Sequence, residues 1–323
     1  MVMEPCSTDL SNGDEINISN LPQQPSWKHS VNLYKYQQFW FYDFPLKGII
    51  QFQQNFIPQP TDIFLATTPK SGTTWLKALA FAIKTRTQFI NNDSDHDSPL
   101  LSTLPHDILP FIEFVYAYGK NRDPQNPLLA THVPFHSLPK SILNSNSKII
   151  YMCRDPKDVL VSQYIFTSKH GDAEIIAFEE VYEKFCDGVS NYGPFWDHVL
   201  GYWKASLEFP DRVLFMKYED LKKDNCFYVK KMADFMGCGF TVDEEKQGIV
   251  EKVIELCSFE HLSKLDVNKS AENRGDGILT RGNESYFRKG KVGDWANYLR
   301  PEMAQRIDQI TCQKFSGTGL SFL

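Results

Sequence analysis

A lysine, a glycine and several hydroxyl side chains stand together in TTPKSGTTWLKAL, residues 67–79. The apolar segment DIFLA precedes this group and the amphipathic segment WLKALAFAI follows it, an order that predicts a strand, a turn and a helix. In such a turn the backbone N–H groups and the helix N-terminus point at one concavity suited to a phosphate. Gly72 would let the backbone approach an anion closely, and Lys70 would add a point charge. The alternative is a capped helix start with an exposed lysine.

The order of residues in this turn differs from the Walker A sequence, G-x-x-x-x-G-K-[ST], in which lysine follows the last glycine. Here Lys70 precedes Gly72 by two residues, so the ammonium group would stand at the start of the turn. This order makes a metal-bound triphosphate a poorer match. A P-loop NTPase or small-molecule kinase is kept as an alternative, for which Asp155 would be the magnesium-bearing acid after an apolar strand.

The segment KIIYMCRDPKDVLVSQYIF, residues 148–166, repeats the pattern of strand, turn and helix. Asp155 is the expected N-cap of its helix, followed by proline at the first helical position. Arg154 would lie at the carboxyl end of the strand, where open α/β sheets bind ligands, and Ser162 two turns into the helix. A second anion could bridge Arg154 and Ser162. The alternative is an ion pair of Arg154 with Asp155 or Asp158.

A third segment, YFRKGKVGDWANYL at residues 286–299, is a local basic cluster in an acidic protein. Arg288, Lys289 and Lys291 surround Gly290, as expected of a loop whose backbone folds over a phosphate. A solvated basic loop is the simpler alternative for this segment taken alone.

These motifs require a scaffold of alternating strands and helices. Short, continuously apolar runs at 62–66, 148–153 and 212–217 predict strands covered on both faces. Helical patterns are expected at about 73–87, 156–169, 177–190, 194–208, 226–237, 242–256 and 301–315. We therefore expect an α/β fold: a single three-layer α/β/α domain with a mostly parallel central sheet and a P-loop-like turn.

Composition limits the classes of function. With 323 residues, of which 42% are hydrophobic, the chain can bury a sizeable core. We expect residues 1–25 to be a disordered tail and residues 26–323 to form the single domain. The net charge of -6 argues against a broad nucleic-acid or anionic-membrane surface, so any anion site must be local.

The cellular compartment is also suggested by composition. The seven cysteines form no C-x-x-C pair, which fits a reducing compartment. The N-terminal stretch is polar, and no apolar run approaches the ~20 residues of a membrane span. We therefore expect a cytoplasmic protein without a membrane segment.

In combination, the motifs KSGTTW, R-D-P-x-D-x-x-x-S and R-K-G-x-x-G-D-W resemble those of the cytosolic sulfotransferases. The resemblance runs from about residue 40 to the C-terminus. Further blocks at 130–139, 193–221 and 256–270 are similar to the plant branch. The resemblance implies transfer of sulfonate from 3′-phosphoadenosine 5′-phosphosulfate (PAPS) to a hydroxyl of a small, largely apolar acceptor. The corresponding bisphosphate (PAP) would be the product, and no metal would be required.

The same resemblance implies which residues bind the donor. The 5′-phosphosulfate would be held by Lys70, Ser71, Gly72, Thr73 and Thr74. The 3′-phosphate would be held by Arg154, Ser162, Arg288, Lys289 and Gly290. The adenine would be contacted by Trp75, Tyr218 and Phe259. In an in-line transfer, Lys70 would stabilise the leaving oxygen by its charge.

The acceptor hydroxyl needs a base, and His132 in ATHVPF matches the family's catalytic histidine. Together with Lys70 and Ser162 it completes the implied catalytic set. Without the resemblance, a lone histidine beside apolar residues would be read as a core or surface residue. His136 would line the acceptor pocket or its rim. Ala130 stands where familiar animal members carry lysine, so a second cationic contact to the sulfonate is absent.

Aromatic residues cluster where the family builds its acceptor pocket. The expected pocket residues are Phe111, Phe114, Tyr116, Phe135, Phe166 and Tyr286, with Phe195 and Trp196 as further candidates. Such a pocket suits flavonoid or other phenolic, hydroxyjasmonate or steroid acceptors. The dimer segment of animal members has no counterpart after the GDW block, so a monomer is expected. A catalytically silent nucleotide-binding module is the alternative from another class.

Overall fold

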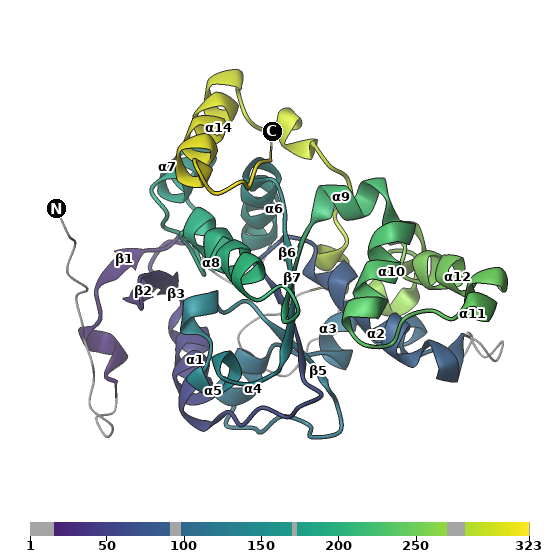
Figure 1. Cartoon of the computed structure of the whole chain (residues 1–323). Helices are drawn as coiled ribbons and strands as arrows, with labels where there is room; N and C mark the ends of the chain where they lie inside the picture. Colours follow the sequence, from purple (N-terminus) through teal and green to yellow (C-terminus); the bar gives the residue numbers. More distant parts are fainter. Residues whose placement is uncertain (1–15, 91–97, 170–172, 270–281, 323) are drawn as a thin grey trace.

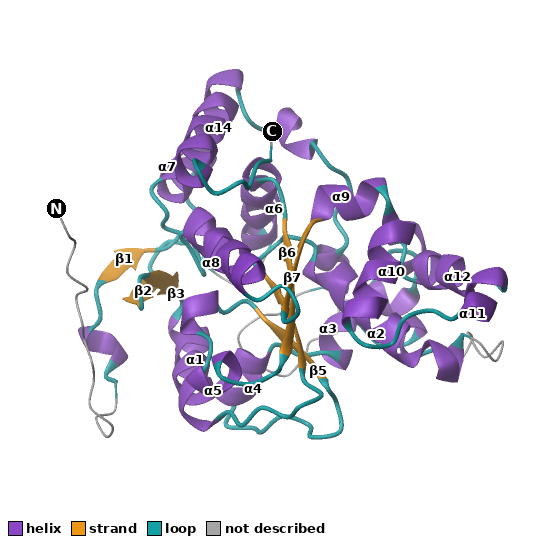
Figure 2. Ribbon diagram, viewed as in Figure 1, coloured by secondary structure: helices purple, strands orange, loops and turns teal. Residues whose placement is uncertain are grey.

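The computed structural model describes residues 16–90, 98–169, 173–269 and 282–322, and its centre is a parallel sheet between two layers of helices (Figures 1 and 2). The sheet has the strand order β5-β4-β6-β7. Its strands are β4 (Ile63–Thr67), β5 (Leu128–Thr131), β6 (Lys148–Cys153) and β7 (Val213–Lys217). All three neighbouring pairs are parallel, so the expected α/β fold with a parallel central sheet is confirmed.

Alternate residues of these strands enter two different hydrophobic cores, because successive side chains of a strand point to opposite faces. In β4, Phe64 belongs to one core and Leu65 to the other. In β6, Tyr151 lies in the same core as Phe64, and Ile150 lies in the same core as Leu65. Both faces of the sheet are therefore buried, which is why its strands are continuously apolar in sequence.

Helices on one side of the sheet pack around α2 (Figure 1). They are α2 (Thr73–Phe89), α9 (Tyr218–Lys223), α10 (Asn225–Phe235), α11 (Val242–Lys246) and α12 (Ile249–Leu256). The expected single helix over 242–256 is therefore wrong. It is broken before Gly248, whose φ of 70° is left-handed and interrupts the helical path.

The opposite side of the sheet is covered by the remaining long helices. They are α1 (Asp43–Asn55), α6 (Pro156–Ser168), α7 (Phe178–Cys186), α8 (Phe195–Glu208) and α14 (Pro301–Phe315). Four short helices lie in the connections: α3 (Pro105–Ile108), α4 (Ile112–Ala117), α5 (Lys140–Leu143) and α13 (Phe259–Leu262). The pair α1 and α4 packs together closely beside the cavity described below.

A small antiparallel sheet precedes α1 and has the order β1-β2-β3. Its strands are β1 (Gln23–Pro25), β2 (Asn32–Tyr36) and β3 (Phe39–Phe41). The expectation of disorder up to residue 25 is wrong for residues 23–25, because β1 pairs with β2, and a 3₁₀ turn spans Ile18–Asn20. Residues 1–15 of the expected tail lie outside the described residues.

The parallel sheet brings the motifs together, because the carboxyl ends of all its strands meet at one edge. Lys70 follows β4, and His132 follows β5. Arg154 follows β6, and Tyr218 follows β7 directly. Segments far apart in the chain thus converge on one region of the molecule.

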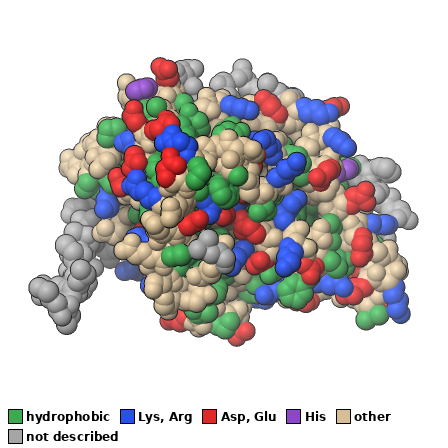
Figure 3. Space-filling view, turned by 90° about the horizontal axis from the view of Figure 1, so that it is seen from above, with side chains coloured by type: hydrophobic (Ala, Val, Ile, Leu, Met, Phe, Trp, Pro, Cys, Tyr) green, Lys and Arg blue, Asp and Glu red, His purple; other side chains and the backbone are tan. Residues whose placement is uncertain are grey.

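The outer surface carries charges of both signs. On the face seen in Figure 3, Lys and Arg side chains are interspersed with Asp and Glu. Within the described ranges, no helix combines the length and apolar character needed to cross a membrane.

Candidate functional site

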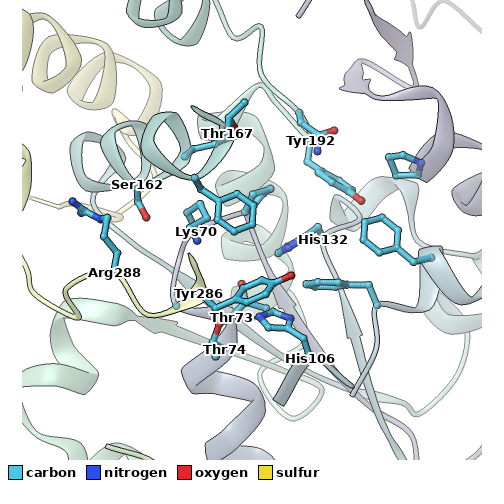
Figure 4. A pocket seen from close by; sticks show the side chains of 18 of the residues that line it. Lys70, Thr73, Thr74, His106, His132, Ser162, Thr167, Tyr192, Tyr286 and Arg288 are labelled. Atoms are coloured by element: carbon cyan, nitrogen blue, oxygen red, sulfur yellow. Dashed lines mark hydrogen bonds between the residues drawn. The ribbon is translucent and has the colours of Figure 1, made fainter. Parts of the chain in front are cut away.

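A cavity of about 1060 Å³ lies at the carboxyl ends of the strands (Figure 4). Its walls include most of the residues expected to bind the donor: Lys70, Gly72, Thr73, Thr74, Trp75, Arg154, Ser162, Tyr218, Phe259, Arg288, Lys289 and Gly290. His132 lines the same cavity. Ser71 does not: its side chain is fully buried and its hydroxyl bonds to that of Thr68. Ser71 can therefore offer only its backbone to a ligand.

The turn after β4 has a backbone that requires glycine. Gly72 has a φ of 95°, which side-chain-bearing residues rarely adopt. A Cβ atom at this position would lie 2.7 Å from Cδ2 of Tyr218 and 2.8 Å from Cε of Met152. Since α2 begins at Thr73, the first N–H groups of a 17-residue helix lie at this turn without a side-chain cap. The N–H groups at the start of α2 therefore have no side-chain cap, and the predicted binding of an anion at this turn stays a prediction.

The Lys70 ammonium lies over two aromatic rings. Its Nζ is 3.8 Å from the ring centroid of Phe166 and 6.0 Å from that of Tyr286. Phe166 comes from α6, and Tyr286 ends a 3₁₀ turn, Asn283–Tyr286. Figure 4 shows Lys70 and His132 pointing into the same cavity, with Ser162 and Arg288 on the side of Lys70 away from His132. The rings favour a charged lysine at the centre of the cavity.

His132 is oriented by a hydrogen bond to the backbone. Its Nδ1 lies 2.8 Å from the carbonyl oxygen of Thr67, which can only accept, so Nδ1 carries the proton and Nε2 keeps a lone pair. The ring also stacks against Phe111 at a centroid distance of 4.3 Å. Burial, together with the positive charges of Lys77 and Lys70, lowers the pKa of His132 to about 3. The imidazole is therefore neutral and can accept a proton.

The backbone around His132 is fixed by Glu113, which the sequence analysis did not single out. This fully buried carboxylate accepts hydrogen bonds from the Thr131 hydroxyl at 2.9 Å and from the His132 N–H at 2.9 Å. It also accepts one from the Tyr192 hydroxyl at 3.2 Å. Burial raises the pKa of Glu113, and these hydrogen bonds oppose the rise. An acid inside the apolar run PFIEF was the only signal in the sequence.

Arg154 is buried at the end of β6, and the protein satisfies only part of its guanidinium group. Its Nη2 donates to Asp158 at 3.1 Å and to the Lys291 carbonyl at 2.7 Å. The ion pair with Asp158, considered as an alternative, is thus present, yet Arg154 also lines the cavity. Its Nε is buried and has no hydrogen-bond partner within the described structure. A buried donor of this kind fits an anionic group in the cavity.

The basic loop near the C-terminus is held by Asp294. Both Arg288 and Lys289 form ion pairs with this carboxylate, the latter at 2.7 Å. Burial opposes the ionisation of Asp294, but hydrogen bonds from Lys289 and Arg288 lower its pKa to about 2. The two cations are therefore held at the cavity wall.

The residues expected around the adenine also come together. The rings of Trp75 and Tyr218 lie edge to face with centroids 5.5 Å apart. Gly290 has a φ of 61°, and a Cβ there would lie 2.6 Å from the Phe259 ring, so only glycine lets this loop approach Phe259. Nε1 of Trp75 is a second buried donor without a partner in the described chain. These features fit a bound nucleotide, which has hydrogen-bond acceptor atoms of its own.

Only part of the expected acceptor pocket lines the cavity. Phe111, Phe114, Phe166 and Tyr286 do so. The other candidates do not, since they pack into the hydrophobic core between α1, α8 and the sheet: Tyr116, Phe135, Phe195 and Trp196. His136 is exposed outside the cavity lining, so its expected position at the pocket is wrong.

The cavity also has walls that the sequence did not indicate. Tyr192 and His106 line it, and so do residues from the small N-terminal sheet and the start of α1: Trp27, Val31, Leu33, Tyr34, Tyr42 and Phe44. No local motif marks these residues, because they reach the cavity only through the packing of the small sheet against the main body.

Two observations concern the alternative of a P-loop NTPase or small-molecule kinase, in which Asp155 would hold magnesium. Asp155 is the N-cap of α6, and its carboxylate accepts from the Lys157 N–H at 2.8 Å. Among the described residues, no group of three or more His, Cys, Asp or Glu side chains is placed to hold a metal.

Comparisons with known proteins identify the family. The family model of the sulfotransferase domain matches residues 60–319. A flavonol 4′-sulfotransferase of Flaveria chlorifolia is 47% identical over 98% of this chain and 99% of its own. A flavonol 3-sulfotransferase of Flaveria bidentis is 48% identical over 94% of this chain and 98% of its own. Cytosolic sulfotransferase 16 of Arabidopsis thaliana is 44% identical over 94% of this chain and 90% of its own.

Solved structures agree with this result. An Arabidopsis thaliana protein assigned to the steroid sulphotransferases is 37% identical, with a TM-score of 0.75 over 95% of this chain and 94% of that one. A mouse sulfotransferase complexed with PAP is 26% identical, with a TM-score of 0.68 over 89% of this chain and 95% of that one. The resemblance inferred from the three motifs is thereby confirmed. The chain is a sulfotransferase and belongs to the sulfotransferase family, alongside flavonol and cytosolic sulfotransferases of plants.

Proposed function

We propose that this sulfotransferase moves the sulfonate group of PAPS to a hydroxyl of a small, largely apolar acceptor of the flavonoid type. Relatives at 47% and 48% identity are named flavonol sulfotransferases, and a solved relative binds PAP. The observation that carries the proposal is the pairing of a neutral His132 with a cationic Lys70 in one cavity. They follow the neighbouring strands β5 and β4.

The donor end supplies local positive charge in an acidic protein. The cations that line the cavity include Lys70, Arg154, Lys222, Arg288 and Lys289. We assign the 5′-phosphosulfate to the turn at Gly72 and the start of α2, where the backbone N–H groups have no side-chain cap. We assign the 3′-phosphate to the other end, near Ser162, Arg154 and Arg288. Trp75, Tyr218 and Phe259 then enclose the adenine.

The transfer itself requires one proton acceptor and one cation. Nε2 of His132 takes the proton of the acceptor hydroxyl while the acceptor oxygen forms its bond to sulfur. The bond between sulfur and the bridging oxygen of the phosphosulfate breaks in line with it, and the negative charge collects on the phosphate. Lys70 stabilises that charge, so PAP leaves as an anion and no metal is needed.

The acceptor end is lined mainly by rings. The ring of Phe111 contacts those of His132 and Phe114, and residues of the small N-terminal sheet also line the cavity. Rings with a few polar atoms suit a flat polycyclic phenol. We further propose that the protein acts in the cytosol, as the names of Arabidopsis relatives suggest for those proteins, and that it acts as a monomer.

The proposal can be tested with purified protein, PAPS and excess EDTA. Flavonols, other phenols, hydroxyjasmonates and steroids are supplied as separate acceptors, and mass spectrometry detects a sulfonate adduct. We expect adducts on flavonols in the presence of EDTA. Adducts on steroids alone would overturn the acceptor class, and turnover that requires added Mg²⁺ would overturn the metal-free mechanism.

A further inference from the structure

His106 is a second histidine in the cavity, and none of the motifs involves it. It belongs to the short helix α3, and its ring contacts two side chains of α2, Thr74 and Lys77. Figure 4 shows the ring beside Thr74. Its Nε2 is 2.8 Å from Oγ1 of Thr74, and its Nδ1 is 3.0 Å from Nζ of Lys77. The ring also stacks on Tyr286 at a centroid distance of 4.3 Å. Both ring nitrogens are thus engaged.

Lys77 is buried completely, which is rare for lysine and costs free energy unless the charge is compensated. Its Nζ lies 3.5 Å from the ring centroid of Phe111, a contact that favours an ammonium group. Burial lowers the pKa of Lys77 well below its usual value, while the nearby carboxylates of Glu113 and Asp107 oppose that change. The Phe111 ring and the two carboxylates thus favour the ammonium form of Lys77, against the effect of burial.

The direction of each hydrogen bond follows from the ammonium form of Lys77. An ammonium group has donors only, so Nζ donates to Nδ1 of His106. A neutral imidazole then carries its proton on Nε2, and Nε2 donates to Oγ1 of Thr74. Since the oxygen of Thr74 is accepting this bond, its own O–H remains available as a donor. Thr74 stands in the first turn of α2 and lines the cavity.

We propose that Lys77 and His106 form a hydrogen-bond relay that turns the Thr74 hydroxyl toward the 5′ anion of the donor nucleotide. This inference rests on the proposed function, because it presumes that the phosphosulfate lies at the turn before α2. Lys77 and His106 are positioning residues, since they act through Thr74 rather than on the reacting atoms. Thr74 adds a charge-assisted hydrogen bond to those of the backbone.

The relay predicts a loss of affinity confined to one end of the nucleotide. In His106→Phe the ring and its stacking on Tyr286 are kept, but both hydrogen bonds are lost. We expect PAP to bind roughly 10- to 100-fold more weakly, the usual effect of losing a hydrogen bond to a charged group. Adenosine 3′-monophosphate lacks the 5′ anion, so its affinity should stay within about twofold of wild type. Titration calorimetry with each nucleotide provides the measurement.

A double-mutant cycle separates a relay from independent contacts. Thr74→Val should weaken PAP as much as His106→Phe does, and the double variant should be no weaker than either single variant. His106→Gln provides a conservative replacement, because its amide can accept from Lys77 and donate to Thr74; it should regain most of the PAP affinity. His136→Phe removes an exposed histidine outside the cavity lining and should change nothing.

The outcomes distinguish this proposal from the proposed function. Equal losses of affinity for PAP and adenosine 3′-monophosphate, or additive losses in the double variant, would overturn the relay. In that case, binding of PAP by the wild-type protein would still support the proposed donor site. If wild type itself bound neither nucleotide, the proposed function would fail and the relay with it. If His106→Phe does not fold, Thr74→Val and His106→Gln are compared instead. The relay predicts that only His106→Gln binds PAP nearly as well as wild type does, and equal affinities in the two variants would overturn it.

Discussion

At the scale of single residues, the orientation of His132 depends on the Thr67 carbonyl, and the position of its backbone depends on Glu113. The first contact fixes the tautomer, so that Nε2 faces the cavity with a lone pair. The second holds the end of β5 and Tyr192 through one carboxylate. The backbone position of a histidine recognised from its motif thus depends on an acid elsewhere in the chain.

Glu113→Gln tests this dependence. An amide offers one acceptor oxygen in place of two, so at least one of the three donors loses its partner inside the core. We expect the free energy of unfolding to fall by about 1–3 kcal/mol, with a lower turnover from a displaced His132. Urea unfolding and steady-state kinetics measure the two effects. Glu208→Gln, at an exposed helix end, should leave both unchanged; a Glu113→Gln protein as stable as wild type would refute the role.

Single residues also show which parts of the candidate site could be predicted from the sequence and which could not. Lys70, His132, Arg154 and Arg288 could be named because each stands in a motif, and the structure brings them to one cavity. Residues that join the site only through packing, such as His106, carry no local signal. The aromatic candidates show the same limit: a ring in the core and a ring in the pocket have the same sequence pattern, so Phe111 and Phe135 could not be told apart.

At the scale of elements, the turn between β4 and α2 is the most constrained part of the site. Gly72→Ala would place a methyl group against Tyr218 and Met152 at a backbone angle that disfavours any side chain. We expect at least a tenfold loss of PAP affinity, because the turn must open to relieve contacts under 3 Å.

Gly119→Ala is the matched control for this variant. Gly119 also has a positive φ, of 66°, but a Cβ there would meet no atom within 4 Å. This variant should lose only about 1 kcal/mol of stability from backbone strain and should bind PAP normally. Equal losses of PAP affinity in both variants would mean that the close contact at Gly72 is unimportant.

The elements that the sequence predicted well are those with a strong local pattern. The apolar run at 148–153 is β6 without any shift, and the expected helix at 301–315 is α14. In contrast, β5 is only four residues long, and α1 contains proline and glycine, so neither had a clear signal. The hairpin between β2 and β3 turns on Gln37 and Gln38 with positive φ, where asparagine or glycine is the usual signal.

At the scale of the whole molecule, two buried histidines link stability to pH. Burial lowers the pKa of His132 to about 3 and that of His198 to about 4, from an ordinary value of 6.5. Below pH 6.5 the unfolded chain binds protons at these positions and the folded chain does not. The free energy of unfolding therefore falls as pH decreases from 6.5 toward 4, by about 1.4 kcal/mol per pH unit for each histidine.

His198→Gln removes one of the two histidines that bind a proton in the unfolded chain but not in the folded chain. The loss of stability between pH 6 and pH 5 should then be smaller than in wild type by about 1 kcal/mol. Using the difference between the two proteins matters, because buried carboxylates such as Glu113 have raised pKa values and act with the opposite sign. Urea unfolding at each pH gives the values. The same pH dependence in both proteins would show that His198 is not buried as a neutral group.

The most direct test of the account is a single-turnover reaction of His132→Ala with PAPS and a flavonol acceptor. Removing the base should slow formation of the sulfonate adduct by roughly 10²- to 10⁴-fold. PAP affinity, measured by calorimetry on the same protein, should stay at the wild-type value, since His132 does not hold the donor nucleotide. Wild-type turnover in His132→Ala would contradict the account, because the proton of the acceptor hydroxyl would then be taken by another group.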